Sequence, residues 1–154
     1  MTDVFSEEKR SYVMSRVSSK DTKPEKIVRS FLHRAGFRFR LHSPGLPGKP
    51  DLVLAKYKTA IFVHGCFWHR HPGCKRTTTP ATRREFWVEK FKKNVIRDNH
   101  NYQKLKEQGW EVIVVWACKL EKKQSRDEAL KNLVRTLTQF PGSRRRFCKK
   151  KQIP

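Results

Sequence analysis

The sequence predicts a single α/β domain, in which helices flank a mixed central sheet. Three observations indicate this class. Short strand-like segments are grouped between residues 37 and 64, a segment that is apolar on both faces follows at 110–116, and amphipathic helical segments surround them. A chain of 154 residues can bury one core but is too short for a second domain of ordinary size.

Residues 1–21 are polar and basic with only scattered apolar side chains, so we expect a basic N-terminal arm that adds little to the core. A first helix is predicted from Thr22 to Gly36, because Thr22 and Glu25 form the T-x-x-E pattern of a capping box and Pro24 lies in the first turn. Its apolar stripe consists of Ile27, Val28, Phe31, Leu32 and Ala35.

Three strands are expected next. Apolar and basic residues alternate over 37–41, which predicts a half-buried strand, and the sequence SPGLPGKP at 43–50 predicts a turn. Residues 51–55 and 59–64 are short apolar segments separated by three residues, which predicts that the three strands form an antiparallel meander.

The second half of the chain predicts a loop followed by helix, strand and helix. Residues 65–84 show no periodicity, and structureless loops of this length are usually functional. Helices are predicted at 85–108 and 129–140. The strand at 110–116 is apolar on both faces, which favours a central position covered by helices. We therefore expect one folded domain at 22–142.

Residues 143–154 form a basic C-terminal tail, for which we expect disorder. Over the whole chain 36 Lys and Arg face 14 acidic residues, and the net charge of +22 favours a polyanionic partner. Nucleic acid fits this charge better than a membrane, since no apolar run is long enough to span a bilayer. The N-terminus also lacks a secretory h-region. We expect a soluble intracellular protein without a membrane partner.

Because disulfides are rare in intracellular proteins, four cysteines in such a protein favour a metal site over disulfide bonds. Cys66, His71 and Cys74 follow a C-x4-H-x2-C pattern in the irregular loop, and Cys118 lies just after the strand at 110–116. Together they can form a closed tetrahedral zinc site that fastens the loop to the sheet. The alternative is that the thiols are simply buried and the loop is flexible. Cys148, in the basic tail, is expected to be free.

Asp51 follows Pro50 at the start of one strand, and His69 follows the neighbouring strand. A carboxylate at a strand end can hold a hard cation such as Mg²⁺, while a nearby histidine can accept a proton from water. The alternatives are a turn residue for Asp51 and a structural role for His69. For Glu25 the capping box is sufficient explanation.

Aromatic and basic side chains are interleaved between residues 67 and 87. Exposed rings at Phe67 and Trp68 could stack on bases or insert between them. Core packing is an equal alternative for Trp87 and is favoured for Phe86. Basic side chains near these rings are Arg70, Lys75, Arg76, Arg83 and Arg84.

The sequences GKPD (48–51), IFVHGCFWHRHPGC (61–74), TPATRREFWVEKFKKNVIRD (79–98) and GWEVIVVWAC (109–118) together resemble the very short patch repair (Vsr) endonuclease family. The resemblance covers about residues 10–118 in order. It implies a restriction-endonuclease-like fold. It also implies magnesium-dependent nicking of one strand beside the thymine of a T·G mismatch that arises when 5-methylcytosine is deaminated.

The resemblance also implies roles for individual residues. Asp51 and the main-chain carbonyl of Val63 would bind Mg²⁺, and His69 would be the base. His64 and Glu25 would complete the catalytic site, and Asp98 would orient a histidine. The zinc ligands would be Cys66, His71, Cys74 and Cys118. The DNA-binding residues would be Phe67, Trp68 and Trp87, to which we add Arg70, Lys75 and Arg76. The N-terminal segment, residues 1–21, would be an arm that binds the DNA duplex.

Two departures from the wider fold are visible. Where related nucleases carry Glu-x-Lys, this chain has Phe62-Val63-His64, which favours the repair subfamily and catalysis by histidine. Position 63 lacks a hydroxyl group, but a carbonyl ligand does not depend on the side chain.

The expected partner is double-stranded DNA with a T·G mismatch, bound by a monomer that is associated with the bacterial nucleoid in the cytoplasm, together with other repair proteins. Two alternatives remain open. One is a nicking or homing endonuclease of the same fold with another DNA target, and the other is a non-catalytic zinc-containing module that binds nucleic acid.

Overall fold

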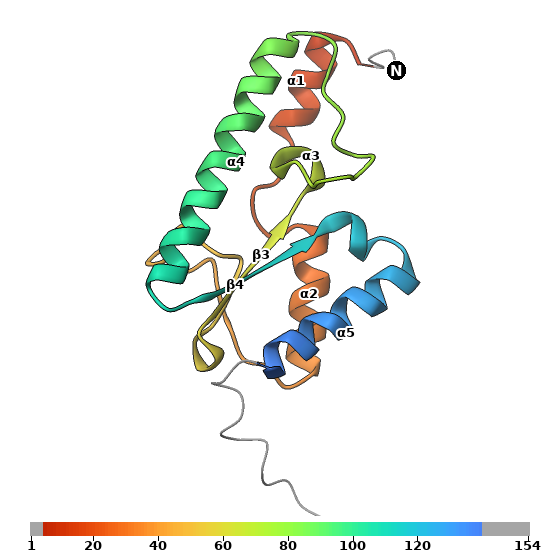
Figure 1. The fold of residues 1–154 in the computed structure, drawn as a ribbon. Coiled ribbons are helices and arrows are strands. Elements are labelled where there is room, and N and C mark those ends of the chain that lie inside the picture. Colours follow the sequence, from red (N-terminus) through yellow and green to blue (C-terminus); the bar gives the residue numbers. More distant parts are fainter. Residues whose placement is uncertain (1–4, 140–154) are drawn as a thin grey trace, which may run out of the picture.

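A computed structural model describes residues 5–139, in which helices lie on both faces of a four-stranded sheet (Figure 1). The helices are α1 (Glu7–Ser15), α2 (Lys23–Arg34), α3 (Cys66–His69), α4 (Arg84–Glu107) and α5 (Lys123–Gln139), with 3-10 turns η1 (Ala55–Tyr57) and η2 (Ala117–Leu120). The strands are β1 (Arg40–Leu41), β2 (Leu52–Leu54), β3 (Thr59–His64) and β4 (Glu111–Trp116).

The sheet has the order β1-β2-β3-β4. Strands β1, β2 and β3 pair antiparallel, which confirms the predicted meander, and β4 pairs parallel to β3. The expectation that residues 110–116 form a central strand is wrong for the described residues, because β4 lies at an edge of this sheet. The residues of β4 are apolar because helices cover both faces of the sheet. A strand at the edge of the hydrogen-bonding order is covered on its faces in the same way as a central strand.

Two apolar clusters fill the spaces on either side of the sheet. The larger joins α2 and α5 to the sheet, with Leu32 and Leu137 fully buried, and the smaller joins Leu105 of α4 to Ala60 and Phe62 of β3. The predicted mixed α/β architecture with flanking helices is therefore confirmed. Helix α5 begins at Lys123, six residues before its predicted start, since its first turns carry no apolar stripe. Its predicted end at residue 140 lies outside the described residues.

The N-terminal segment contains a helix, α1, which begins after Ser6, whose side chain accepts a hydrogen bond from the Lys9 amide at 3.3 Å. None of the residues of α1 is buried. Figure 1 places α1 beside α3 and the N-terminal end of α4. The segment therefore adds little to the core, and α1 lies along the outside of the start of α4.

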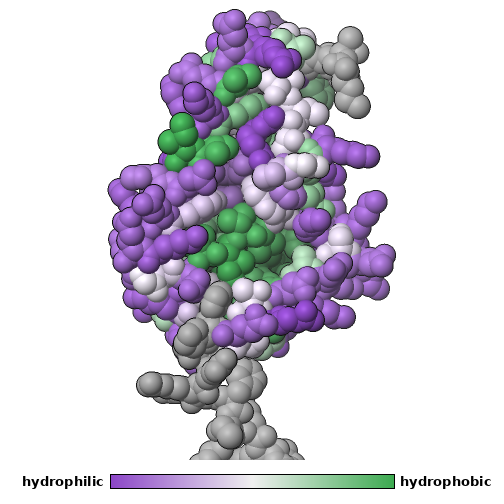
Figure 2. All heavy atoms as spheres, viewed as in Figure 1, coloured by the Kyte–Doolittle hydropathy of each residue, from purple (hydrophilic) through white to green (hydrophobic). Residues whose placement is uncertain are grey.

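The predicted loop at 65–84 includes the single turn of α3, which directly follows β3. From the side shown in Figure 1, the surface is mostly hydrophilic, and hydrophobic side chains gather in a hollow near its middle (Figure 2). Over residues 5–139, no helix combines the length and apolar character needed to cross a bilayer.

Candidate active site and metal centre

Polar side chains gather where β2 begins and β3 ends, next to α3 and the middle of α4. Asp51, just before β2, is half-buried and accepts a hydrogen bond from the Val63 amide at 2.7 Å through Oδ2. Burial raises the pKa of Asp51 above its ordinary value. The Val63 amide opposes this shift, and the nearby Glu25 carboxylate adds to it. The antiparallel pairing of β2 with β3 thus places Asp51 beside Val63, although the two are twelve residues apart.

Glu25 is 3% exposed, and its charge acts on the carboxyl group of Asp51. It accepts hydrogen bonds from the Thr22 hydroxyl at 2.7 Å and from Arg29 at 2.8 Å. Thr22 donates to the Glu25 side chain and does not cap the helix, and Glu25 accepts from the amide of Asp21 at 3.0 Å, one residue before the N-cap, so the contacts differ from those of the expected capping box. Glu25 is thus available to the site through its charge, as well as supporting the start of α2.

The sequence reasoning missed Arg29 and His42. A guanidinium nitrogen of Arg29 lies 2.9 Å from His42 Nε2, and His42 Nδ1 lies 3.9 Å from Asp51 Oδ1. Arg29 also forms an ion pair with Asp21. Arg29 could have been found, because it lies four residues after Glu25 and therefore on the same face of the helix. His42 carries no comparable signal, since β1 brings it to Asp51 only by pairing with β2.

A second group is formed by two histidines and a carboxylate. The rings of His64 and His69 stack with centroids 3.7 Å apart and an interplanar angle of 7°. His69 Nδ1 lies 2.5 Å from Asp98 Oδ2, so the structure brings together the three residues that were expected here. Burial and, to a smaller extent, the neighbouring His69 lower the pKa of His64 to about 3. Burial raises the pKa of Asp98, but its hydrogen bond to His69 and the nearby charges of His69, His64 and Arg97 together outweigh burial, so the pKa is lowered overall.

Tyr102 completes this group and was not expected from the sequence. Its hydroxyl forms a hydrogen bond with His64 Nε2. Burial raises the pKa of Tyr102, and so do the charges of Asp98 and Asp51. Val63, whose amide binds Asp51, directly precedes His64 in β3, so the Asp51 group and the histidine pair lie next to each other along this strand. The signal available in the sequence was the spacing of four residues from Asp98 on α4.

This arrangement can bind a hard divalent cation and accept a proton. The pKa of Asp51 is raised beside a second carboxylate, so a cation would relieve their mutual repulsion. Carboxylate and carbonyl oxygens suit Mg²⁺, which retains positions for water and phosphate. His69, oriented by Asp98, is placed to take up a proton.

The four expected soft ligands also meet. One ligand atom from each of Cys66, His71, Cys74 and Cys118 lies within 4.8 Å of the others. His71 Nδ1 is 3.6 Å from the Cys66 sulfur and 3.3 Å from the Cys118 sulfur. A tetrahedral zinc ion with ordinary bond lengths requires S···N separations of about 3.6 Å, so the donor set fits such an ion. The cluster joins the loop after β3 to the end of β4, and Cys148 lies outside the described residues.

The aromatic residues pack against one another beside this loop. Phe67 contacts Trp68, Trp87 and Phe91, with ring centroids between 5.0 and 5.7 Å apart. Trp87 is 7% exposed, whereas Phe86 is 44% exposed, which is the reverse of the core packing favoured for Phe86. The side of α4 that faces α3 decides which of these adjacent rings is covered.

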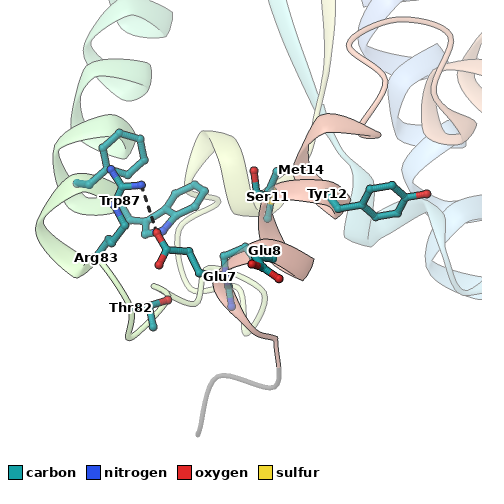
Figure 3. Close-up of a pocket in the computed structure, with 10 residues that line it drawn as sticks. Glu7, Glu8, Ser11, Tyr12, Met14, Thr82, Arg83 and Trp87 are labelled. Atoms are coloured by element: carbon teal, nitrogen blue, oxygen red, sulfur yellow. Dashed lines mark ion pairs between the residues drawn. The ribbon is translucent and has the colours of Figure 1, made fainter.

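A cavity of about 570 Å³ lies between α1 and the start of α4 (Figure 3). Trp87 and Phe86 line one side and residues of α1, including Glu7 and Met14, line the other. Glu7 and Arg83 form an ion pair of 3.8 Å across it, drawn as a dashed line in Figure 3. The cavity is thus bounded by the N-terminal segment and by the aromatic group.

The basic residues expected to contact DNA have different surroundings. Arg70 donates to the carbonyls of Thr77 and Thr78 at 2.7 and 3.1 Å and therefore holds the loop together. Arg76 forms an ion pair with Glu121, and Lys75 is exposed. Of these three residues, Arg70 and Arg76 therefore already form contacts within the protein, and Lys75 is the one with an exposed charge outside these contacts.

Comparison with known proteins identifies relatives of this chain. A model of the family described as DNA mismatch endonuclease Vsr matches residues 2–76. A type II nicking enzyme of Neisseria meningitidis, V.NmeAIP, is 48% identical over 89% of this chain and 97% of its own length. Another nicking enzyme, V.XorIIP of Xanthomonas oryzae, is 46% identical over 87% of this chain and 98% of its own length.

The DNA mismatch endonuclease Vsr of Escherichia coli is 45% identical over 84% of this chain and 83% of its own length. These matches extend well beyond the N-terminal half that the family model covers. The chain therefore belongs to the Vsr family of DNA mismatch endonucleases, which are hydrolases that cleave DNA.

Proposed function

We propose that this enzyme nicks one strand of duplex DNA beside the thymine of a T·G mismatch, by magnesium-assisted hydrolysis of a phosphodiester bond. The observation that carries the proposal is the single site formed by Asp51, Val63, His64, His69 and Asp98. Its fold would be the restriction-endonuclease-like one, which the antiparallel meander followed by a parallel strand supports.

Asp51 and the main-chain carbonyl of Val63 would hold Mg²⁺, which when bound stabilises the charge that develops on the phosphate. His69 accepts the proton of the attacking water. Asp98 stabilises the protonated ring, because its carboxylate contacts Nδ1 and leaves Nε2 for the water. Glu25 adds negative charge that favours retention of the cation, and Arg29 keeps its carboxylate in place.

Zinc would be the ion held by Cys66, His71, Cys74 and Cys118. Cysteine and histidine ligands with tetrahedral spacing favour zinc over magnesium, and a site closed by four protein ligands has no position left for substrate. Its role is therefore structural. It would fix α3, which carries both the aromatic residues and His69, against the end of β4.

DNA would lie along the cavity between α1 and α4, with residues 1–21 acting as the arm and residues 22–142 as the nuclease domain. Trp68 and Phe67 would insert beside the mismatch, with Trp87 beneath them. Lys90 lies 5.6 Å from the Trp68 ring and can meet a phosphate near an inserted ring. Unstacking costs less at an imperfect pair, which favours a T·G mismatch over a paired site.

The decisive test is nicking of matched duplexes that differ only in one T·G or T·A pair, with and without Mg²⁺. We expect a nick beside the thymine of the T·G duplex when Mg²⁺ is present, and no nick when it is absent. Equal nicking of both duplexes, or nicking without any divalent cation, would contradict the proposal. Cleavage confined to a fully paired sequence would favour the alternative of a nicking endonuclease with another target, which the names of the two nicking-enzyme relatives support.

The role of the inserted rings is tested with Trp68→Ala and, as a control, Val88→Ala, which removes an exposed apolar residue of α4. We expect Trp68→Ala to reduce the ratio of T·G to T·A nicking by about tenfold or more, because loss of the wedge removes a few kcal/mol of discrimination at the unstacked step. The metal content of both variants should match the parent. A parental ratio in Trp68→Ala would exclude this ring as a wedge.

A further inference from the structure

One face of α4 contacts both histidines of the site. Asp98 and Tyr102 are four residues apart, so their side chains project from the same face in successive turns. Asp98 binds His69 Nδ1 at 2.5 Å, and the Tyr102 hydroxyl binds His64 Nε2. Because the two histidine rings are stacked and nearly parallel, with centroids 3.7 Å apart, the orientation of one ring limits that of the other.

The chemistry of the phenol determines the direction of its hydrogen bond. Among the described residues, His64 Nε2 is the partner that the structure gives to the Tyr102 hydroxyl. If the phenol only accepted, its own proton would be left without an acceptor in a partly buried position, which is unfavourable. A phenol that donates to His64 Nε2 satisfies its own proton, and the neutral His64 ring would then carry its proton on Nδ1.

The position of Tyr102 is itself fixed by packing. Its ring meets Phe62 edge-on, with centroids 5.2 Å apart, and Phe62 is 5% exposed in the core between β3 and α4. Phe62 also packs against His64, with ring centroids 5.5 Å apart. Tyr102 is thus anchored at its ring and directs its hydroxyl at the histidine from a rigid helix.

We propose that Tyr102 is a positioning residue of the reaction, which holds His64 in the Nδ1–H tautomer and in the orientation on which His69 stacks. This inference rests on the proposed function, because it gives His69 the task of accepting the proton of water. Tyr102 acts through His64 and does not contact the substrate. Its loss should therefore slow the chemical step and leave DNA binding unchanged.

The test compares Tyr102→Phe, which removes only the hydroxyl, with Tyr57→Phe. Tyr57 is a buried tyrosine that packs on Phe37 in the core on the other side of the sheet. We expect Tyr102→Phe to lower the single-turnover nicking rate on a T·G duplex by about 10–100-fold, as loss of an orienting partner typically does. Affinity for the same duplex should stay within about twofold, and Tyr57→Phe should nick at the parental rate. A parental rate in Tyr102→Phe, or an equal loss of affinity, would overturn the inference.

A second measurement does not depend on activity. Side-chain ¹⁵N NMR of the parent, labelled at histidine, should show His64 with its proton on Nδ1, and Tyr102→Phe should show a mixture of the two tautomers. A parent with the His64 proton on Nε2 would overturn the inference even if the variant did not fold. If the parent failed to nick any mismatched duplex, the proposed function would fail, whereas the tautomer measurement would still decide the role of Tyr102.

Discussion

The cysteine cluster consists of Cys66, His71, Cys74 and Cys118, and the Asp51 site consists of Asp51, Val63 and the neighbouring Glu25. Only a few residues of β3 and α3 separate them, yet the spacing and charge of their polar atoms differ. In the cysteine cluster, one histidine nitrogen lies 3.3 and 3.6 Å from two sulfurs, close to the separations around a tetrahedral ion. At the Asp51 site, a carboxylate with a raised pKa lies near the second carboxylate of Glu25, and its direct partner is the Val63 amide.

The difference teaches that neighbouring sites can contribute to stability with opposite signs. A set of four protein ligands can be completed by an ion alone, and the binding energy then adds to the folding free energy. A site that must accept water and a phosphate keeps positions open, so its charges are incompletely compensated before substrate arrives. We therefore expect mutations in the cysteine cluster to destabilise the protein and mutation of Asp51 to inactivate it without destabilising it.

The largest expected effect is on catalysis at Asp51. Asp51→Asn keeps the shape of the side chain and an oxygen for the Val63 amide, but it removes the charge that holds the cation. The loss of several kcal/mol of stabilisation at the transition state corresponds to a decrease of about 10³-fold or more in single-turnover nicking. DNA affinity, measured by fluorescence anisotropy, should change by about threefold at most. A variant that nicks within tenfold of the parent would remove Asp51 from the catalytic site.

His69→Ala should lower the nicking rate by about 10²–10⁴-fold, the range typical for loss of a general base. Asp98→Asn, which keeps the ring contact but weakens its electrostatic support, should cost about 10–100-fold. The order of the two losses separates a base from its orienting partner. If Asp98→Asn were the more severe, His69 would not be the proton acceptor.

In the cysteine cluster, Cys118→Ser should remove one ligand and lower the melting temperature by on the order of 10 °C, because metal binding is coupled to folding. Elemental analysis should find one tightly held zinc in the parent and less in the variant. Cys148→Ser, in the segment beyond the described residues, is the matched control. A Cys118→Ser protein with parental zinc content and stability would mean that the cluster holds no structural ion.

The smallest expected effect is a change in the melting temperature of Asp51→Asn, measured without divalent cations. The folded-state pKa of Asp51 is raised, so the folded protein loses stability as pH rises through that pKa, and at neutral pH it carries an unfavourable charge. We expect the variant to melt about 1–4 °C above the parent at pH 7, as a change on the order of 1 kcal/mol produces in a chain of this size.

This advantage should shrink as pH falls and the parent carboxyl becomes protonated. Added Mg²⁺ should stabilise the parent only, because the variant has lost the charge that binds it. A lower melting temperature for Asp51→Asn in calorimetry would contradict the contrast between the two sites.

Local patterns in the sequence were sufficient to predict α2, α4, most of α5, the strands of the meander and the four cysteine and histidine ligands. Short segments show their periodicity directly, and spacings such as C-x4-H-x2-C restrict which side chains can meet. Their motifs also carried the resemblance to the Vsr family. The pairing of Glu25 with Arg29 was equally visible, because residues four apart on a helix are always neighbours.

Contacts between distant elements were decided only by the tertiary structure. His64 and Tyr102 are 38 residues apart, and the parallel alignment of β3 with β4 together with the packing of α4 brings them into contact. Which of Phe86 and Trp87 is buried likewise depends on the side of α4 that faces α3. The sequence by itself determined which chemical groups this protein has and which of them are local neighbours. The tertiary structure decided which distant groups meet, because strand order and helix orientation depend on the packing of the whole core and not on any one segment.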